Sequence, residues 1–204
     1  MKDERASRWL RHAGLAMALL QQPLTARGHH NSTGMGPVYD GLIHFLTSPE
    51  DLIAALAVAL LVGLRGVDFG RRALWVLATA WLSGCLVGLT ASATNASAVL
   101  PAFWFLLLGG LVALDTRLSP RATTALAALV GVMHGYFNGA GMGLSTSAIG
   151  ATLGVVCAVF VLTALAAAFV LWLQAQWARI AVRVAGSWIA ASGLLMMGWA
   201  LRAA

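Results

Sequence analysis

The stretch AIGATLGVVCAVFVLTALAAAFVLWL, residues 148–173, contains no charged side chain and is apolar over its whole length. A helix needs about 20 mainly apolar residues to cross the roughly 30 Å hydrocarbon core of a bilayer, and this stretch is long enough. Its hydrophobicity is continuous and not alternating, so it does not fit a lipid-facing strand of a β-barrel. Because backbone N–H and C=O groups must be satisfied inside lipid, the stretch predicts a transmembrane helix.

The same pattern recurs along the rest of the chain. Hydrophobic residues make up 60% of the 204 residues, charged residues make up 10%, and the mean hydropathy is +0.82. This composition leaves too little polar surface for a water-soluble domain of this length. We therefore predict an all-α polytopic membrane protein, built as a bundle of six transmembrane helices. The predicted spans are 42–64, 73–91, 98–114, 122–138, 148–173 and 180–201.

Two pairs of glycines within these spans have the spacing that lets helix backbones approach closely. Gly84 and Gly88 form one pair, and Gly150 and Gly154 form the other. Small residues four positions apart share one face of a helix, and such faces are common where membrane helices pack together. This spacing favours a compact single bundle.

The first 28 residues have the features of an export signal. A basic segment comes first, and the apolar run Ala13 to Leu20 that follows is too short to span a bilayer. Ala26 and Gly28 then supply the small residues that a signal peptidase requires. We expect cleavage after Gly28, which leaves a six-span transmembrane domain at 29–204. The alternative is that 1–28 remains as an uncleaved N-terminal anchor.

Basic residues occur in every second gap between the predicted spans, whereas the gaps 92–97 and 139–147 carry no charge. By the positive-inside rule the arginine-bearing gaps face the cytoplasm, so both mature termini lie outside. A cleaved export signal independently requires an outside N-terminus. The arginines are spread over short loops and form no basic face, so no nucleic-acid partner is expected. They are Arg65, Arg71, Arg72, Arg117, Arg121, Arg179 and Arg183.

Polar and ionisable residues are costly inside a bilayer, so their positions carry functional information. Two groups fall at the predicted outer face, one around the start of the first span and one at the end of the fourth. Imidazole, carboxylate and amide groups gathered on one side could coordinate a divalent cation. The candidate metal ligands are His29, His30, His44, Glu50, Asp51, His134 and Asn138.

Each of these groups also has a purely structural interpretation. The run 48–51, Ser-Pro-Glu-Asp, fits a helix start with serine as N-cap, proline at the first helical position and acids in the first turn. His134 and Asn138 are four residues apart and could hydrogen-bond to neighbouring backbone. His29 and His30 could belong to a solvated tail.

Around these residues the chain resembles the HupE/UreJ family, membrane proteins associated with hydrogenase and urease clusters. Several members of that family are regarded as nickel or cobalt permeases. Residues 44–59 are similar to the family motif H-P-x-x-G-x-D-H-x-L-A-M-x-A-V-G, and residues 133–141 to the motif F-H-G-x-A-H-G-x-E. The first histidine of each motif is kept, as His44 and His134. The resemblance covers most of the mature chain.

The chain departs from the family motifs at several ligand positions. Asp51 and Asn138 stand where the family pattern has histidines. Glu50 replaces an aspartate, and Gly141 replaces a glutamate. These changes shift the set of donor atoms from nitrogen-rich towards oxygen-rich, which weakens the case for tight and selective nickel binding.

The resemblance implies a permease or metallocentre accessory protein of the bacterial plasma (inner) membrane, with periplasmic termini, that takes a divalent ion such as nickel or cobalt from the outer face. No permanently bound cofactor is expected. The implied partners are the lipid bilayer, the metal ion, and further copies of the chain or metalloenzyme maturation proteins. The alternative is a non-transporting scaffold for metalloenzyme or membrane-complex assembly. No enzyme is expected, because the strings nearest to the G-x-S-G motif of an intramembrane protease, 81–84 and 190–193, lack the first glycine.

The predicted orientation can be tested with single cysteines in a background without the two native cysteines. We expect His30→Cys and Gly141→Cys to react with an impermeant thiol reagent applied from outside, because both positions lie in outer segments. We expect Arg71→Cys and Arg121→Cys to react only after the membrane is permeabilised. Outside labelling at position 71 or 121 would overturn the orientation.

Overall fold

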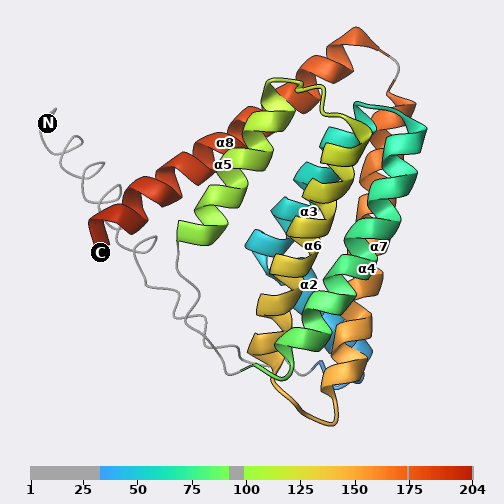
Figure 1. Ribbon diagram of the computed structural model, residues 1–204, viewed down its shortest axis with the longest axis vertical. Helices are drawn as coiled ribbons and strands as arrows, with labels where there is room; N and C mark the ends of the chain where they lie inside the picture. The colour runs from blue at the N-terminus through green and yellow to red at the C-terminus, as the bar shows by residue number, and fades with distance from the viewer. Residues whose placement is uncertain (1–32, 92–98, 174, 204) are drawn as a thin grey trace, which may run out of the picture.

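The computed structural model describes residues 33–91, 99–173 and 175–203. Every regular element within these ranges is an α-helix (Figure 1), which confirms the all-helical prediction. The predicted signal segment 1–28 and the candidate ligands His29 and His30 lie outside the described residues. The helices are α2 (Pro37–Thr47), α3 (Pro49–Gly63), α4 (Val67–Gly88), α5 (Val99–Ala113), α6 (Pro120–Met142), α7 (Ala148–Trp172) and α8 (Gln176–Ala203).

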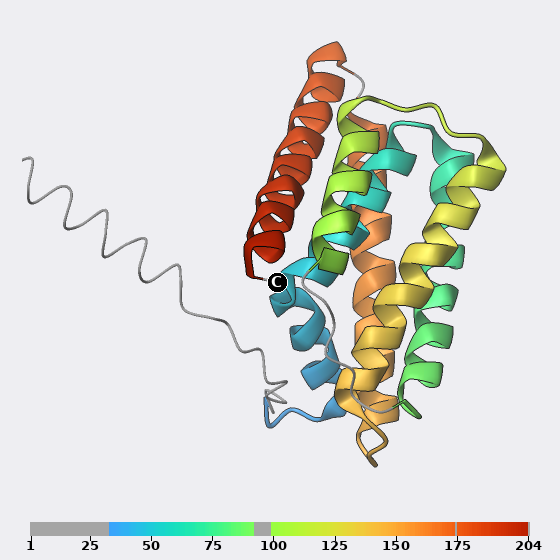
Figure 2. The same cartoon turned by 60° about the vertical axis from the view of Figure 1, so that its left-hand side comes forward.

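From α3 onwards the helices alternate in direction, so that successive turns lie at opposite ends of the bundle (Figures 1 and 2). Helix α4 packs against α6, α5 packs against α8, and α7 contacts α2, α3 and α4. The turns that follow α3, α5 and α7 share one end, at the top of Figure 1. The seven arginines of the basic gaps lie in these turns or in the first turns of the next helix. We call this end of the molecule the arginine end.

The first predicted span, 42–64, is wrong as a single helix. Helices α2 and α3 meet at Ser48 with a bend of 76°. Pro49 lacks an N–H and disfavours helical backbone at the preceding residue, so Ser48 adopts an extended conformation (φ −94°, ψ 98°). The Ser48 hydroxyl donates to the carbonyl oxygen of His44 at 2.7 Å, which satisfies one of the groups left open at the end of α2. Figure 2 shows this junction about halfway along the bundle.

The other five predicted spans each correspond to one helix, with ends shifted by a few residues. The largest shift is at α4, which begins at Val67 and not at 73. Gly66, with a φ of 114°, turns the chain directly after α3, and a positive φ of this kind favours glycine. Arg71 and Arg72 therefore lie on the helix and not in the loop.

Two of the described helices, α7 and α8, are each long and apolar enough to cross a membrane. The bent pair α2–α3 would count as a third span. Helix α5 is apolar but has only 15 residues. These helices support the membrane character of the protein, while the count of six spans stays a prediction.

Helices α4 and α6 pack with their backbones in contact. A Cβ atom built at Gly84 or Gly88 of α4 would overlap the backbone of α6. The reverse holds for Gly131, Gly135 and Gly139 of α6, where a Cβ atom would overlap α4. The predicted role of the Gly84 and Gly88 spacing is therefore confirmed, and the three glycines of α6 supply the matching face. We call these five residues the glycine ladder.

The second predicted glycine pair brings α7 against α2. A Cβ atom at Gly150 would lie 2.8 Å from Cβ of Pro37, and one at Gly154 would overlap the carbonyl of Val38. The spacing of Gly150 and Gly154 is thus also confirmed as a close-packing motif.

The glycine ladder predicts that substitution by alanine will change the stability of the protein very differently at two glycines of α6. We expect Gly139→Ala to destabilise the protein by about 1–3 kcal/mol, the usual cost of over-packing, because its new methyl group would overlap the backbone of Cys85. Gly141→Ala is the matched control, since no atom lies within 4 Å of its Cβ position. Alanine favours a helix by up to about 1 kcal/mol over glycine, so this control should not lose stability. Unfolding of the purified protein in detergent measures both, and equal stability would contradict the close contact.

Candidate functional site: a buried carboxylate at a broken helix

Asp51 lies in the first turn of α3 and inside the bundle, with 4% of its surface exposed. Ser48 is the N-cap residue and Pro49 follows it, as the helix-start interpretation predicts, but the Ser48 side chain makes no capping hydrogen bond to α3. The positive end of the α3 dipole favours a negative charge at this position. Even so, an unpaired carboxylate is expensive to bury, and Asp51 needs hydrogen-bond donors.

Helix α6 supplies two partners for this carboxylate. The Nδ1 atom of His134 lies 2.8 Å from Oδ1 of Asp51. The side-chain Nδ2 of Asn138 donates to Oδ2 of Asp51 at 2.7 Å and to the backbone oxygen of His134 at 3.0 Å. His134 and Asn138 are 7% and 6% exposed. We call these three residues the Asp51 cluster.

The position of the cluster follows from the spacing of residues on α6. His134 and Asn138 are four residues apart, so they occupy the same face of the helix one turn from each other. Each directly precedes a glycine of the ladder, Gly135 or Gly139, which holds α6 against α4. The cluster is therefore anchored from both sides, by α3 through Asp51 and by α4 through the glycine ladder.

The contact between His134 and Asp51 constrains where the ring carries its hydrogen. With an ionised carboxylate, Nδ1 of His134 must be the donor, because a carboxylate only accepts. A neutral ring then presents an unprotonated Nε2. That atom is buried and has no hydrogen-bond partner, and the same is true of Oδ1 of Asn138. Both are donor atoms for a metal ion.

Two tryptophans enclose the imidazole of His134. The Trp81 ring centroid lies 5.4 Å from that of His134, and the Trp104 centroid lies 6.3 Å away. These indoles come from α4 and α5 and are 0% and 4% exposed. Their Nε1 atoms are buried and also lack partners. A buried polar atom without a partner costs about 1–3 kcal/mol, so the surroundings of His134 are suited to a polar guest such as water or an ion.

The remaining candidate ligands do not join this cluster. His44 on α2 and Glu50 on α3 are exposed, and within the described residues no hydrogen bond or ion pair links their side chains to it. The part of the chain that the structure describes contains no group of three or more histidine, cysteine and acidic side chains placed to hold a metal ion. Of the ionisable candidate ligands in the described residues, Asp51 and His134 thus meet at the site, and Asn138 adds an amide.

Sequence reasoning did not include Trp81 and Trp104 among the candidate site residues. A signal for Trp81 was present, because Trp81, Gly84 and Gly88 share one face of α4, the face that packs on α6. Trp104 gave no such signal, since it lies in a helix that is apolar on all sides. Only the packing of α5 beside α3 brings it to His134.

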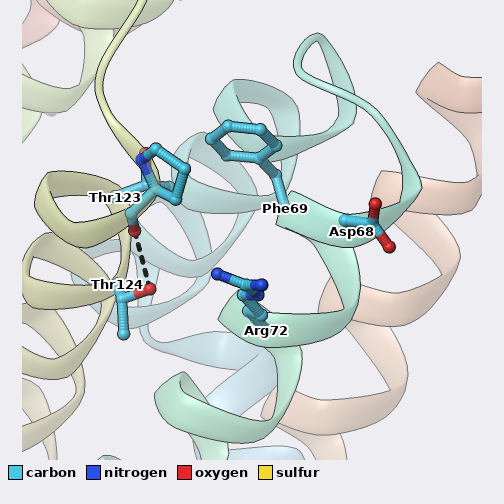
Figure 3. A pocket seen from close by; sticks show the side chains of 6 residues that line it. Asp68, Phe69, Arg72, Thr123 and Thr124 are labelled. Carbon is cyan, nitrogen blue, oxygen red and sulfur yellow. Dashed lines mark hydrogen bonds between the residues drawn. The ribbon is translucent and has the colours of Figure 1, made fainter.

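A separate cavity of about 170 Å³ lies at the arginine end, between the first turns of α4 and α6. Figure 3 shows Phe69 and Arg72 of α4 on the side of Thr123 and Thr124 of α6, whereas the carboxylate of Asp68, which also lines the cavity, points away from them. The two threonine hydroxyls donate to carbonyl oxygens of the preceding turn, at 3.0 and 2.8 Å, which uses their donor hydrogens. This cavity lies about three turns along α6 from His134 and does not contribute to the Asp51 cluster.

The fold and the cluster together define an all-helical membrane protein with a buried carboxylate, imidazole and amide beside a broken helix. The family model described as HupE / UreJ protein matches residues 15–196, nearly the whole chain. The chain therefore belongs to the HupE/UreJ family. No curated protein and no solved structure matches it at a significant level.

The geometry predicts that replacing Asp51 will destabilise the protein much more than replacing its neighbour Glu50. We expect Asp51→Ala to destabilise the protein by about 3 kcal/mol or more, because it leaves the buried donors of His134 and Asn138 unpaired. Asp51→Asn should lose less, since its amide oxygen can still accept one hydrogen bond. Glu50→Ala is the matched control, and at an exposed position its effect should stay within about 0.5 kcal/mol. Denaturant unfolding in detergent tests this, and equal losses for Asp51→Ala and Glu50→Ala would refute the structural role of the cluster.

Proposed function

We propose that this protein is a permease for divalent nickel-like or cobalt-like ions, which enter from the outer face and pass the Asp51 cluster. Membership of the HupE/UreJ family supports a role in nickel or cobalt transport or as an accessory protein. The observation that carries the proposal is the burial of an acid, an imidazole and an amide with two unpartnered donor atoms, Nε2 of His134 and Oδ1 of Asn138.

The chemistry of these donors suits a borderline divalent metal. Imidazole nitrogen is a common ligand of nickel and other transition metals, whereas carboxylate and amide oxygens bind harder cations. A site with one nitrogen donor and few oxygens binds less tightly than one built from several histidines. Moderate affinity favours transport, because an ion must leave its site as well as enter it.

The broken helix supports passage through the bundle. Membrane transporters commonly bind substrates near the middle of the bilayer, where discontinuous helices expose helix ends to a cavity. The α2–α3 junction lies about halfway along the bundle (Figure 2), and Asp51 follows it within one turn. The α3 dipole is unfavourable for a bare cation, so the negative charge of Asp51 is what makes the position acceptable to one.

A capture role before the cluster falls to the N-terminal histidines, His29 and His30, which lie outside the described residues. His44 and Glu50 lie on the two sides of the Ser48 break, and their side chains are exposed on the surface of the bundle. The chain has no nucleotide-binding motif, so the membrane potential is the proposed driving force, worth ~2.3 kcal/mol per charge per 100 mV and twice that for a divalent ion.

A non-transporting scaffold is the second candidate. The observation that favours it is the small number of ionisable groups at the cluster, since the described residues hold no set of three that could bind a metal. Such a protein would use the same fold to present partners to a metalloenzyme under assembly, without moving an ion.

Uptake of radiolabelled nickel or cobalt into proteoliposomes with an inside-negative potential separates the two candidates. We expect uptake by the wild type to exceed that of empty vesicles. Asp51→Asn and His134→Ala should each reduce it by about tenfold or more, since even the partners of metal ligands change affinity by 10–100-fold. Asp68→Asn makes the same chemical change at an exposed acid of the arginine end and should leave uptake within about twofold.

The same uptake experiment has results that would refute the permease or the proposed pathway. Wild-type vesicles that take up no more ion than empty ones would refute the permease. Uptake that is equal in Asp51→Asn and Asp68→Asn would instead refute the assignment of the pathway to the Asp51 cluster.

A further inference from the structure

Asp115 links three turns at the arginine end. It lies in the turn between α5 and α6 and has a φ of 50°. Arg65, in the turn between α3 and α4, forms an ion pair with Oδ1 of Asp115 and also donates to its backbone oxygen at 3.0 Å. Arg179, at the start of α8, pairs with Oδ2 at 2.8 Å. One carboxylate therefore serves two guanidinium groups.

Around Asp115 the positive charge of the arginines exceeds the single negative charge of the carboxylate. Burial lowers the pKa of Arg65, and repulsion from Arg179 and Arg117 lowers it further. The Arg65 side chain is only 8% exposed, and its Nε has no hydrogen-bond partner. The Arg65 guanidinium is therefore buried with an unused N–H donor and two cationic neighbours. An additional anion next to it would satisfy this donor and balance the charge.

A partly open cavity of about 260 Å³ lies beside these arginines. It is formed where the end of α3 and the α3–α4 turn meet the end of α7 and the start of α8. Arg65 and Arg179 provide its cationic side, and apolar side chains provide the rest. The apolar lining includes Leu64, Val170, Leu173 and Val182.

The side chains around the cavity are of the kind found at the level of the lipid headgroups. Trp172 and Trp177, on either side of the α7–α8 connection, are 75% and 67% exposed. Exposed tryptophans at helix ends are typical of the interface between bilayer and water. The cavity thus combines a cationic part at headgroup level with an apolar part at the end of a membrane helix.

We propose that this cavity binds the phosphate group of an anionic phospholipid between Arg65 and Arg179, with the start of its acyl chains against the apolar lining. Arginine is suited to this task, because its planar set of donors matches phosphate oxygens in pairs. Basic pockets between transmembrane helices bind anionic headgroups in the same manner. The bound phosphate supplies the negative charge that the two arginines need in addition to that of Asp115. This site is independent of the metal pathway.

Native mass spectrometry of the delipidated full chain in detergent tests the proposal with three probes, phosphatidylglycerol, phosphatidylcholine and inorganic phosphate. We expect phosphatidylglycerol to be retained at least about tenfold better than phosphatidylcholine. Arg179→Gln should remove most of this preference, the effect expected for losing a charge-assisted hydrogen bond. Arg179 is half exposed, so this variant should fold. Arg71→Gln, an exposed arginine of the same end outside the cavity lining, is the control and should keep the preference.

Asp115→Asn distinguishes a lipid site from a purely structural ion-pair network. Asparagine tolerates a positive φ and removes the carboxylate that competes with phosphate for the two arginines. We expect this variant to retain phosphatidylglycerol more strongly than the wild type, whereas a structural network would only lose stability.

Three results would overturn the lipid as the occupant of this cavity. Equal retention of the two lipids by the wild type, or equal effects of Arg179→Gln and Arg71→Gln, would overturn the proposal. Binding of inorganic phosphate with the same dependence on Arg179, but without retention of phosphatidylglycerol, would overturn the lipid as occupant and assign the phosphate site to a soluble anion.

Discussion

The hydrogen bonds from His134 and Asn138 to the carboxylate of Asp51 join segments that are 83 and 87 residues apart in the chain. An unpaired carboxylate inside an apolar bundle would be too costly to keep, so α3 and α6 must meet at this level. The glycine ladder extends the constraint to α4, because α6 can present both side chains only while its backbone lies against that helix. Three helices are thus positioned by the need to satisfy one acid.

The break at Ser48 is the second part of the same arrangement. A continuous helix over 42–64 would run past the centre of the bundle without a helix start inside it. With Pro49 at the first position of α3, the positive end of a helix dipole lies beside the carboxylate in the interior. A chain rich in alanine and glycine can bury such a polar centre because its close helix contacts separate it from lipid. The proposed function and the packing therefore depend on the same few residues.

The middle of the bundle and its arginine end differ in chemistry. The Asp51 cluster combines acid, imidazole and amide halfway along the bundle, whereas the arginine end has two guanidinium groups on one carboxylate beside an apolar cavity. The chain belongs to the HupE/UreJ family, and His134 is one of the two motif histidines that it keeps. Where the family pattern has two further histidines, this chain has a carboxylate and an amide that bond to each other.

Hydrophobic runs and arginine spacing, read from the sequence alone, determined the helical class, the positions of five helices to within a few residues and the end that carries the basic residues, because these depend on local composition. The grouping of Asp51, His134 and Asn138 among the candidates was also accessible, since polar residues in apolar runs are rare. Tertiary structure decided which candidates meet: it buries Asp51 against α6, leaves His44 and Glu50 exposed, and brings Trp81 and Trp104 to the imidazole. Hydropathy and spacing describe one segment at a time, whereas these contacts depend on which helix faces which, and that is set by packing between distant parts of the chain.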